Sequence, residues 1–262
     1  MRKLLLALAI SVSAVSTLTA SISAAAPAAA ASTSTAAIKS LQQLETVTYQ
    51  SATSFFLYSV LNRDPQHLKK AQASMAVGDS LVAIIGSAAI NTRWAAFKQA
   101  ITSTKFTSEG MAENASLNAL DGTLTALTQT LRSQRMEQRL AANVATDKMA
   151  DLLYDQHVLM QVMTTAYLHK SADYFGGAIV QSDAPQVDID KLAARFQTQL
   201  DQLNRHYAKN KAVAPALREV TTKWTFIRNS FINYNENNVP FIVGRYNEQI
   251  NERLLLAYEK LQ

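Results

Sequence analysis

The sequence predicts an all-α protein, an elongated helical bundle of about five long helices. The first observation is a scarcity of turn residues: the 262 residues include 7 Gly and 5 Pro, where average usage would give roughly 30. A β-sandwich or barrel needs a turn about every ten residues, so both are excluded. The second observation is that apolar residues recur at alternating spacings of three and four, which is the core seam of a bundle helix. The third is the absence of Cys, which excludes disulfide scaffolds, Cys-ligated zinc and iron–sulfur clusters.

Residues 1–25 are predicted to be a secretory signal peptide. Arg2 and Lys3 precede a short apolar run, and the small residues at 23–25 suit a cleavage site. Because this run is short and interrupted by Ser and Thr, it does not suit a membrane anchor, and no later stretch reaches about 18 apolar residues. We therefore expect a periplasmic protein without a membrane span in its mature form. Removing Arg2 and Lys3 lowers the formal charge from +5 to +3, too little to indicate nucleic-acid binding.

The first helices are predicted from seams and caps. Residues 26–37, rich in Ala, Ser and Thr, are expected to form a flexible lead-in, and a first helix spans about 38–62. A second helix begins at Pro65 with Asp64 as its N-cap. Its seam consists of Leu68, Ala71, Met75, Gly78, Val82, Ile85 and Ala89, and resumes at Trp94, Phe97 and Ile101.

A long central helix follows, from near Ser108 to about residue 180 unless Gly176 and Gly177 end it earlier. Its first seam is Leu117, Leu120, Leu124, Leu127 and Leu131. After a turn at 182–186, a fourth helix carries Ile189, Leu192, Phe196, Leu200, Leu203 and Tyr207, and then Leu217, Val220, Trp224, Ile227 and Phe231. Pro215 is expected to kink or restart this helix. The last helix opens at Pro240.

Three pairs of matching features recur in the same order and indicate an internal duplication. Trp94 and Trp224 lie in nonamers that share the pattern basic, Trp, small, any, apolar, basic, amide, small, apolar. The other matches are Asp64 and Pro65 with Asp183 and Pro185, and Leu120 and Leu124 with Ile250 and Leu254. An insertion in the second copy is placed around 208–215. We predict two duplicated three-helix units that share the long central helix, with repeat 1 at 38–145 and repeat 2 at 146–262.

Residues 155–168 (DQHVLMQVMTTAYL) resemble a motif of a known family. It is the N-terminal sensor domain family of type IV pilus methyl-accepting chemotaxis transducers, which is related to the periplasmic domains of nitrate/nitrite sensors. The spacing F-x3-L-x2-L at 196–203 is similar to the family's next helix. The resemblance implies a helical sensor module, here free and secreted in tandem form. Family members carry Arg at the positions of Asp155, His157 and Val162, so nitrate binding is not carried over.

Polar residues interrupt the seam of the central helix beyond Leu131. An unpaired buried amide costs about 1–3 kcal/mol, so Gln residues on a core stripe need partners, and three nearby Arg side chains are suited to a carboxylate or an oxyanion. The candidate ligand-binding residues are Arg132, Gln134, Arg135, Gln138, Arg139, Gln156 and His157. The alternative is a solvated waist between the two units, with the Arg head groups in water.

A second set of residues, His157, Met160 and Met163, lies on roughly one helix face. Such soft ligands suit Cu(I), but the same spacing is typical of ordinary core Met beside a surface His. Our expectation is that the protein uses no cofactor and no metal.

We expect a non-enzymatic periplasmic sensor-like binding protein, because no acid–base pair or nucleophile motif is visible. It would recognise a small ligand, such as an anion, or an envelope partner protein, without nucleic acid; a homodimer is left open. The alternative is a structural or adaptor bundle that docks another envelope protein without a small ligand, and a copper-binding protein ranks third.

Overall fold

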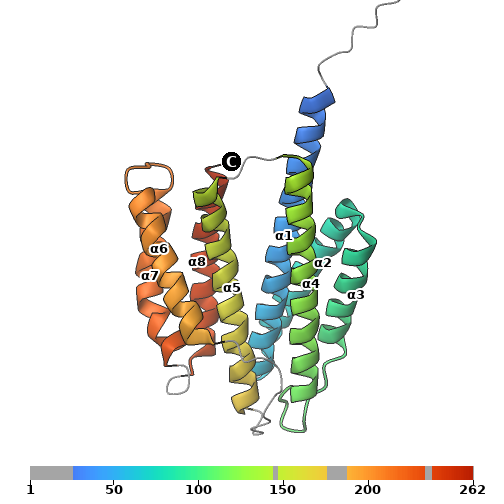
Figure 1. The fold of residues 1–262 in the computed structure, drawn as a ribbon. Coiled ribbons are helices and arrows are strands. Elements are labelled where there is room, and N and C mark those ends of the chain that lie inside the picture. The colour runs from blue at the N-terminus through green and yellow to red at the C-terminus, as the bar shows by residue number, and fades with distance from the viewer. Residues whose placement is uncertain (1–25, 144–146, 176–187, 234–237, 262) are drawn as a thin grey trace, which may run out of the picture.

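The computed structural model describes residues 26–143, 147–175, 188–233 and 238–261. This part of the chain forms helices joined by links (Figure 1), which confirms the all-α prediction. The helices are α1 (Ala26–Val60), α2 (Pro65–Ile85), α3 (Ala88–Thr102), α4 (Asn114–Ala141), α5 (Lys148–Phe175), α6 (Ile189–His206), α7 (Ala214–Ile232) and α8 (Pro240–Glu259). None of these described helices is both long enough and apolar enough to cross a membrane.

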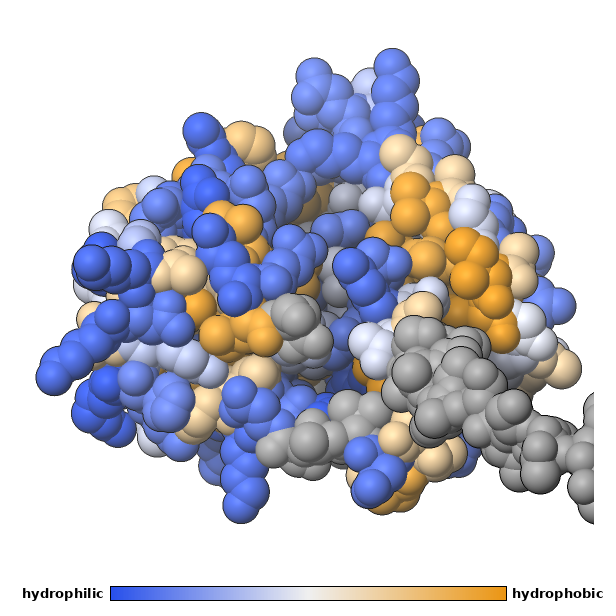
Figure 2. Space-filling view, turned by 90° about the horizontal axis from the view of Figure 1, so that it is seen from above, coloured by the Kyte–Doolittle hydropathy of each residue, from blue (hydrophilic) through white to orange (hydrophobic). Residues whose placement is uncertain are grey.

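The helices form two four-helix bundles that lie side by side. In the N-terminal bundle, α1 to α4, each helix packs against the next and α4 returns to α1; α5 to α8 repeat this arrangement in the C-terminal bundle. Consecutive helices run in opposite directions along one common axis (Figure 1). The bundles meet through α1 and α5, and α8 also touches α1. Seen from above, the molecule has a mostly hydrophilic end that is hollowed between two lobes (Figure 2).

The sequence predicts one helix from Pro65 to Ile101, but the structure has two, α2 and α3. Gly86 has a left-handed backbone (φ 67°), and its N–H donates to the Val82 carbonyl over 3.0 Å. Such a conformation ends a helix, and glycine adopts it without a Cβ penalty. The hydroxyl of Ser87 then accepts the Ile90 N–H and caps α3. The predicted second helix is therefore two antiparallel helices.

The long central helix is also two helices, α4 and α5. The Arg139 guanidinium makes two hydrogen bonds, of 2.5 and 3.0 Å, to the carboxylate of Asp151. Twelve residues of continuous helix would separate these positions by about 18 Å along the axis, so the chain must reverse between them. Asn143, with a positive φ of 47°, follows α4. Each bundle consequently contains four helices, and no helix is shared.

The third break separates α6 from α7, near the expected insertion at 208–215. The side chain of Asn210 accepts the N–H groups of Ala212 and Val213, at 2.9 and 3.1 Å. Pro215 then lies in the first turn of α7, where its missing N–H is harmless. The five predicted helices become eight because a seam that continues in sequence does not require a helix that continues in space.

The start of α1 also differs from the prediction. The helix begins at Ala26, inside the segment 26–37 that composition predicts as a flexible lead-in. This segment is rich in Ala, which has the highest helix propensity of all residues. The first turns of α1 project beyond the other helices (Figure 1). The predicted signal peptide (1–25) and the turn at 182–186 lie outside the described residues.

Most residues of the predicted seams lie in the hydrophobic core, but Ala89 is exposed and Leu68 and Ile85 are half-buried. Leu117, Leu120, Leu124, Leu127 and Leu131 are all buried, as are Ile189, Phe196, Leu200 and Leu203. Both Trp residues are buried on the third helix of their bundles, and each indole donates to the second helix. Trp94 Nε1 donates to Asp79 over 2.7 Å, and Trp224 Nε1 donates to the Gln197 amide oxygen over 2.9 Å.

Helices α1 and α5 are unusual because their buried faces contain many polar side chains. Of the eighteen buried polar residues in the described part of the chain, eight lie on α1 and six on α5. Along α1, every residue from 51 to 57 is buried, since α1 has neighbours in both bundles. The contact between the bundles therefore contains many buried polar groups.

Candidate functional site

Arg132 and Arg135, two of the predicted ligand-binding residues, bind a buried carboxylate of the protein itself. Glu45 of α1 is 1% exposed, and its two oxygens accept from Arg132 Nε at 2.7 Å and from Arg135 Nη1 at 2.9 Å. The hydroxyl of Tyr154 on α5 donates to Glu45 over 2.8 Å, and Arg132 also donates to Tyr49 over 2.9 Å. One carboxylate thus links α1, α4 and α5.

The electrostatics of this cluster favour neutral phenols beside one carboxylate that is paired with two guanidinium groups. Burial raises the pKa of Tyr154 well above its ordinary value, and the adjacent Glu45 raises it further. Burial also raises the pKa of Tyr49, which Arg132 partly opposes. The Arg135 guanidinium lies 4.6 Å from the centre of the Tyr154 ring, a cation–π distance. With Arg139 bound to Asp151, all three guanidinium groups are engaged within the protein, unlike the open anion site that the sequence predicts.

The structure does not bring the three predicted Gln residues together. Gln134 is half-buried, and its amide donates to the Ser87 hydroxyl over 2.7 Å. Gln138 is exposed. Gln156 is fully buried toward α6, where its amide donates to the Phe196 carbonyl over 2.8 Å. The Gln residues of one seam therefore belong to three environments, and they do not form a common pocket.

His157 is buried between the bundles rather than lying on a helix surface. Its Nε2 lies 3.1 Å from the hydroxyl of Thr46 on α1, and its Nδ1 has no hydrogen-bond partner among the described residues. Burial lowers the pKa of His157 from 6.5 to about 4, and the neighbouring Asn251 amide opposes this only in part. The imidazole is consequently neutral near pH 7.

Stability should fall on acidification because of His157. Between pH 6.5 and 4 the unfolded chain binds a proton that the folded protein does not, so the free energy of unfolding decreases by up to ~1.4 kcal/mol per pH unit, about 3 kcal/mol in total. Above pH 6.5 both states are neutral and this effect disappears. Urea unfolding at several pH values should show a shallower slope for His157→Gln, since the carboxylates titrate in both proteins. Equal slopes would contradict the burial of a neutral imidazole.

A cleft of about 640 Å³ lies between the two bundles. Its walls come from α1, α2, α5 and α8. The lining residues include Gln50, Thr53, Ser54, Lys70, Ala73, Ser74, Gln161, Asn247, Glu248, Asn251, Glu252, Leu255, Leu256 and Glu259. The volume is in the range of small-molecule sites, and the walls belong to both bundles.

A hydrogen-bond network of amides holds the α5–α8 side of the cleft. The Asn247 oxygen accepts from the Thr164 hydroxyl at 3.0 Å and from Asn251 Nδ2 at 2.6 Å, and its Nδ2 donates to Gln161 over 3.3 Å. The donor groups of both Asn side chains are therefore used inside the protein.

One deeply buried oxygen that lines this cleft has no partner among the described residues. It is Thr53 Oγ1, and Thr53 is 3% exposed. Asn251 is equally buried, but its amide interacts with the His157 ring. Thr53 differs in this respect from other hydroxyl residues of α1, whose side chains donate to the backbone carbonyl one turn back. These are Thr46, Thr48, Ser51 and Ser59. Leaving such an atom unpaired costs about 1–3 kcal/mol, and native proteins rarely accept that cost without a reason.

The rim of the cleft is acidic. Lys70 and Glu248 form an exposed ion pair of 2.8 Å across it. Glu252 and Glu259 are exposed and have no ion pair within the part of the chain that the structure describes. The cleft thus presents more carboxylates than ammonium groups.

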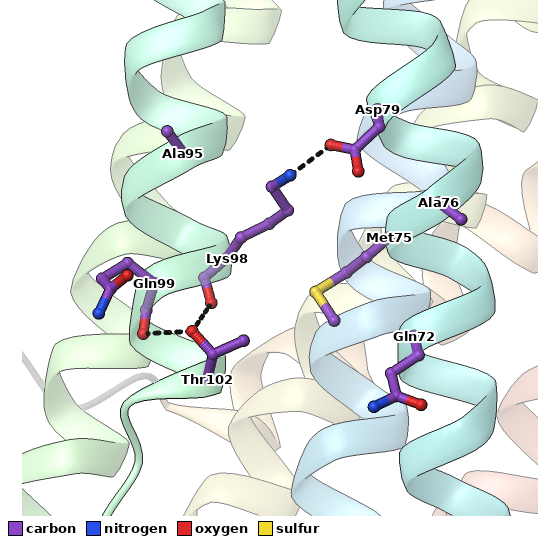
Figure 3. Close-up of a pocket in the computed structure, with 8 residues that line it drawn as sticks. All are labelled: Gln72, Met75, Ala76, Asp79, Ala95, Lys98, Gln99 and Thr102. Carbon is purple, nitrogen blue, oxygen red and sulfur yellow. Dashed lines mark hydrogen bonds and ion pairs between the residues drawn. The ribbon is translucent and has the colours of Figure 1, made fainter.

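A second hollow, of about 450 Å³, is a surface groove between α2 and α3. Figure 3 shows Lys98 of α3 reaching across to Asp79 of α2, while Met75 points into the space between the helices. The Lys98–Asp79 distance is 2.5 Å. No deeply buried unpartnered atom lines this groove among the described residues, so the cleft between the bundles is the stronger candidate.

Sequence reasoning missed the cleft because its residues are spread over four helices. One local signal existed: the hydroxyl-rich stretch 46–54 on a helix that otherwise belongs in a core. Searches against family models, curated proteins and solved structures all give no match. The function is therefore inferred from the chemistry of the cleft.

Proposed function

We propose that this protein is a non-enzymatic binding protein that holds a small ligand in the cleft between its two bundles. The single observation that supports this is the unpartnered buried oxygen Thr53 Oγ1 on the wall of a cleft of about 640 Å³. A ligand hydrogen bond to this atom would offset the free energy that burying it costs.

Ligand occupancy would be read out as a movement of one bundle against the other. The cleft walls belong to α1 and α2 on one side and to α5 and α8 on the other, so a ligand favours the separation that best fits it. Small helix shifts of this kind are a common switching device. A sensor-like role in the envelope also agrees with the predicted signal peptide and with the resemblance of 155–168, on α5, to a sensor family.

We also propose that the two bundles arose by duplication of a four-helix unit. The supporting observation is that Trp94 and Trp224 occupy the third helix of each bundle and donate to Asp79 and Gln197 on the second. The unit is then α1–α4 repeated as α5–α8, a four-helix version of the predicted repeats.

The test of the binding function uses Thr53→Val, which removes the unpaired hydroxyl while keeping the shape. We expect the ligand-free variant to be as stable as the parent or more stable by about 1 kcal/mol, because an unsatisfied polar group is lost. A ligand found by a thermal-shift screen of metabolites should raise the Tm of the parent and bind the variant about tenfold less tightly.

The control is Thr128→Val on α4. Thr128 is equally buried, but its hydroxyl donates to the Leu124 carbonyl over 3.0 Å and it does not line the cleft. This variant should lose stability and keep its affinity. A screen without any Tm shift, together with a clearly destabilised Thr53→Val, would contradict the proposal and favour the adaptor alternative, which capture of an envelope protein would then support.

A further inference from the structure

The charge of the cleft is opposite in sign to that of the whole chain. The protein is basic, with a sequence pI of about 9.3, yet the cleft is lined by Glu248, Glu252 and Glu259 against the single cation Lys70. Local fields of this kind select ligands by charge, because a concave site between low-dielectric walls concentrates the potential. An anionic ligand would be repelled by the two unpaired carboxylates.

The buried hydrogen-bonding group that remains inside the cleft is the Thr53 hydroxyl, because Asn251 directs its Nδ2 to Asn247 and interacts with the His157 ring. The Thr53 hydroxyl has no partner among the described residues and can accept an N–H of a ligand. Because a hydroxyl can also donate, the carboxylates of the cleft decide which charge the ligand carries.

The cleft also has an apolar wall. Leu255 and Leu256 of α8 and Ala73 of α2 are among its lining residues, and such surface suits a short hydrocarbon chain. A ligand that has a cationic end, N–H donors and an apolar stem is a small aliphatic amine.

We infer that the cleft between the bundles binds a small organic cation, a primary ammonium on a short carbon chain. The ammonium is directed to the Thr53 hydroxyl, and the exposed carboxylates of Glu252 and Glu259 line the same cleft. This inference rests on the proposed binding function and specifies its ligand class.

The experiment compares three probes of equal length and different charge on the purified protein: 1,4-diaminobutane, 1,4-butanediol and succinate. Isothermal titration calorimetry should show saturable binding of the diamine, and at least about tenfold weaker binding of the neutral diol, because charge-assisted hydrogen bonds are the stronger ones. Succinate should not bind. Added salt should weaken the binding of the diamine and leave the binding of the diol unchanged.

Two variants localise the binding. The double variant Glu252→Gln/Glu259→Gln should weaken the binding of the diamine about fivefold or more, in line with the loss of two partly screened charges. It should not change the weak binding of the diol. The control Glu137→Gln removes an exposed carboxylate of α4, a helix that does not line the cleft, and should change nothing.

Two outcomes would overturn the inference. If the diol or succinate binds as tightly as the diamine, and Thr53→Val weakens it, the cleft is a ligand site but the ligand class is wrong. If diamine binding survives Thr53→Val and the double Glu variant unchanged, the amine binds elsewhere and the inference fails. The proposed function itself fails only when no ligand of any charge depends on Thr53.

Discussion

Glu45→Ala is expected to lower the free energy of unfolding by about 3–5 kcal/mol, because it removes one member of a buried ion pair. Arg135, whose side chain is only 14% exposed, would lose its carboxylate, and the Tyr154 hydroxyl would lose its acceptor. Three helices from two bundles meet at this carboxylate, so the loss should also loosen the contact between the bundles. Urea unfolding measures the free energy, and hydrogen exchange of α5 amides measures the loosening.

The matched control is Glu219→Ala. Glu219 also accepts from an Arg Nε, that of Arg253, and its 2.8 Å bond is nearly as short as the 2.7 Å bond of Glu45. The Glu219 side chain is 49% exposed, against 1% for Glu45, so we expect less than about 1 kcal/mol. Equal losses in the two variants would show that burial does not determine the strength of the Glu45 cluster.

Gly78→Ala is expected to destabilise the protein by about 2–3 kcal/mol, although alanine is the better helix former. A Cβ at this position would lie 2.3 Å from two ring atoms of Trp94. The ring is only 2% exposed and its indole N–H is bound to Asp79, so it cannot move aside freely. The glycine allows α2 to approach the Trp of α3.

Gly122→Ala on α4 is expected to stabilise the protein instead of destabilising it. An added Cβ there meets nothing within 4 Å, and the position is exposed in the middle of a helix. We expect a gain of about 0.5–1 kcal/mol from helix propensity. Thermal unfolding of both variants should therefore move the Tm in opposite directions, and a stabilised Gly78→Ala would exclude the close Trp94 contact.

Several features of the fold could be predicted from local pattern. The seam from Leu117 to Leu131 is buried as expected, and Asp64 caps α2 by accepting the Gln66 N–H. Helix breaks were harder to predict, although each had a local sign: Gly86 with Ser87, Asn143, and Asn210 before Pro215. The apolar spacing of three and four continues in the sequence across such a residue, because the next helix of a bundle also buries one apolar face.

The candidate site was less predictable than the fold. The sequence places Arg132, Arg135 and Arg139 close together along one helix, but it does not show that the first two bind Glu45 and the third binds Asp151. Glu45 is 87 and 90 positions away from Arg132 and Arg135. Thr53 and Asn251 are separated by most of the chain and share a cleft only because α1 and α8 touch.

The sequence by itself determined that the chain is helical and which face of most helices is buried, because both depend on spacings within one or two turns. The tertiary structure decided where the chain reverses, which carboxylate neutralises each Arg, and which buried hydroxyl remains unpaired beside a cleft. The physical reason is the separation along the chain of the groups that interact. Helix periodicity is local, whereas a charge or a hydrogen bond in a core is settled by whichever groups packing brings within about 3 Å.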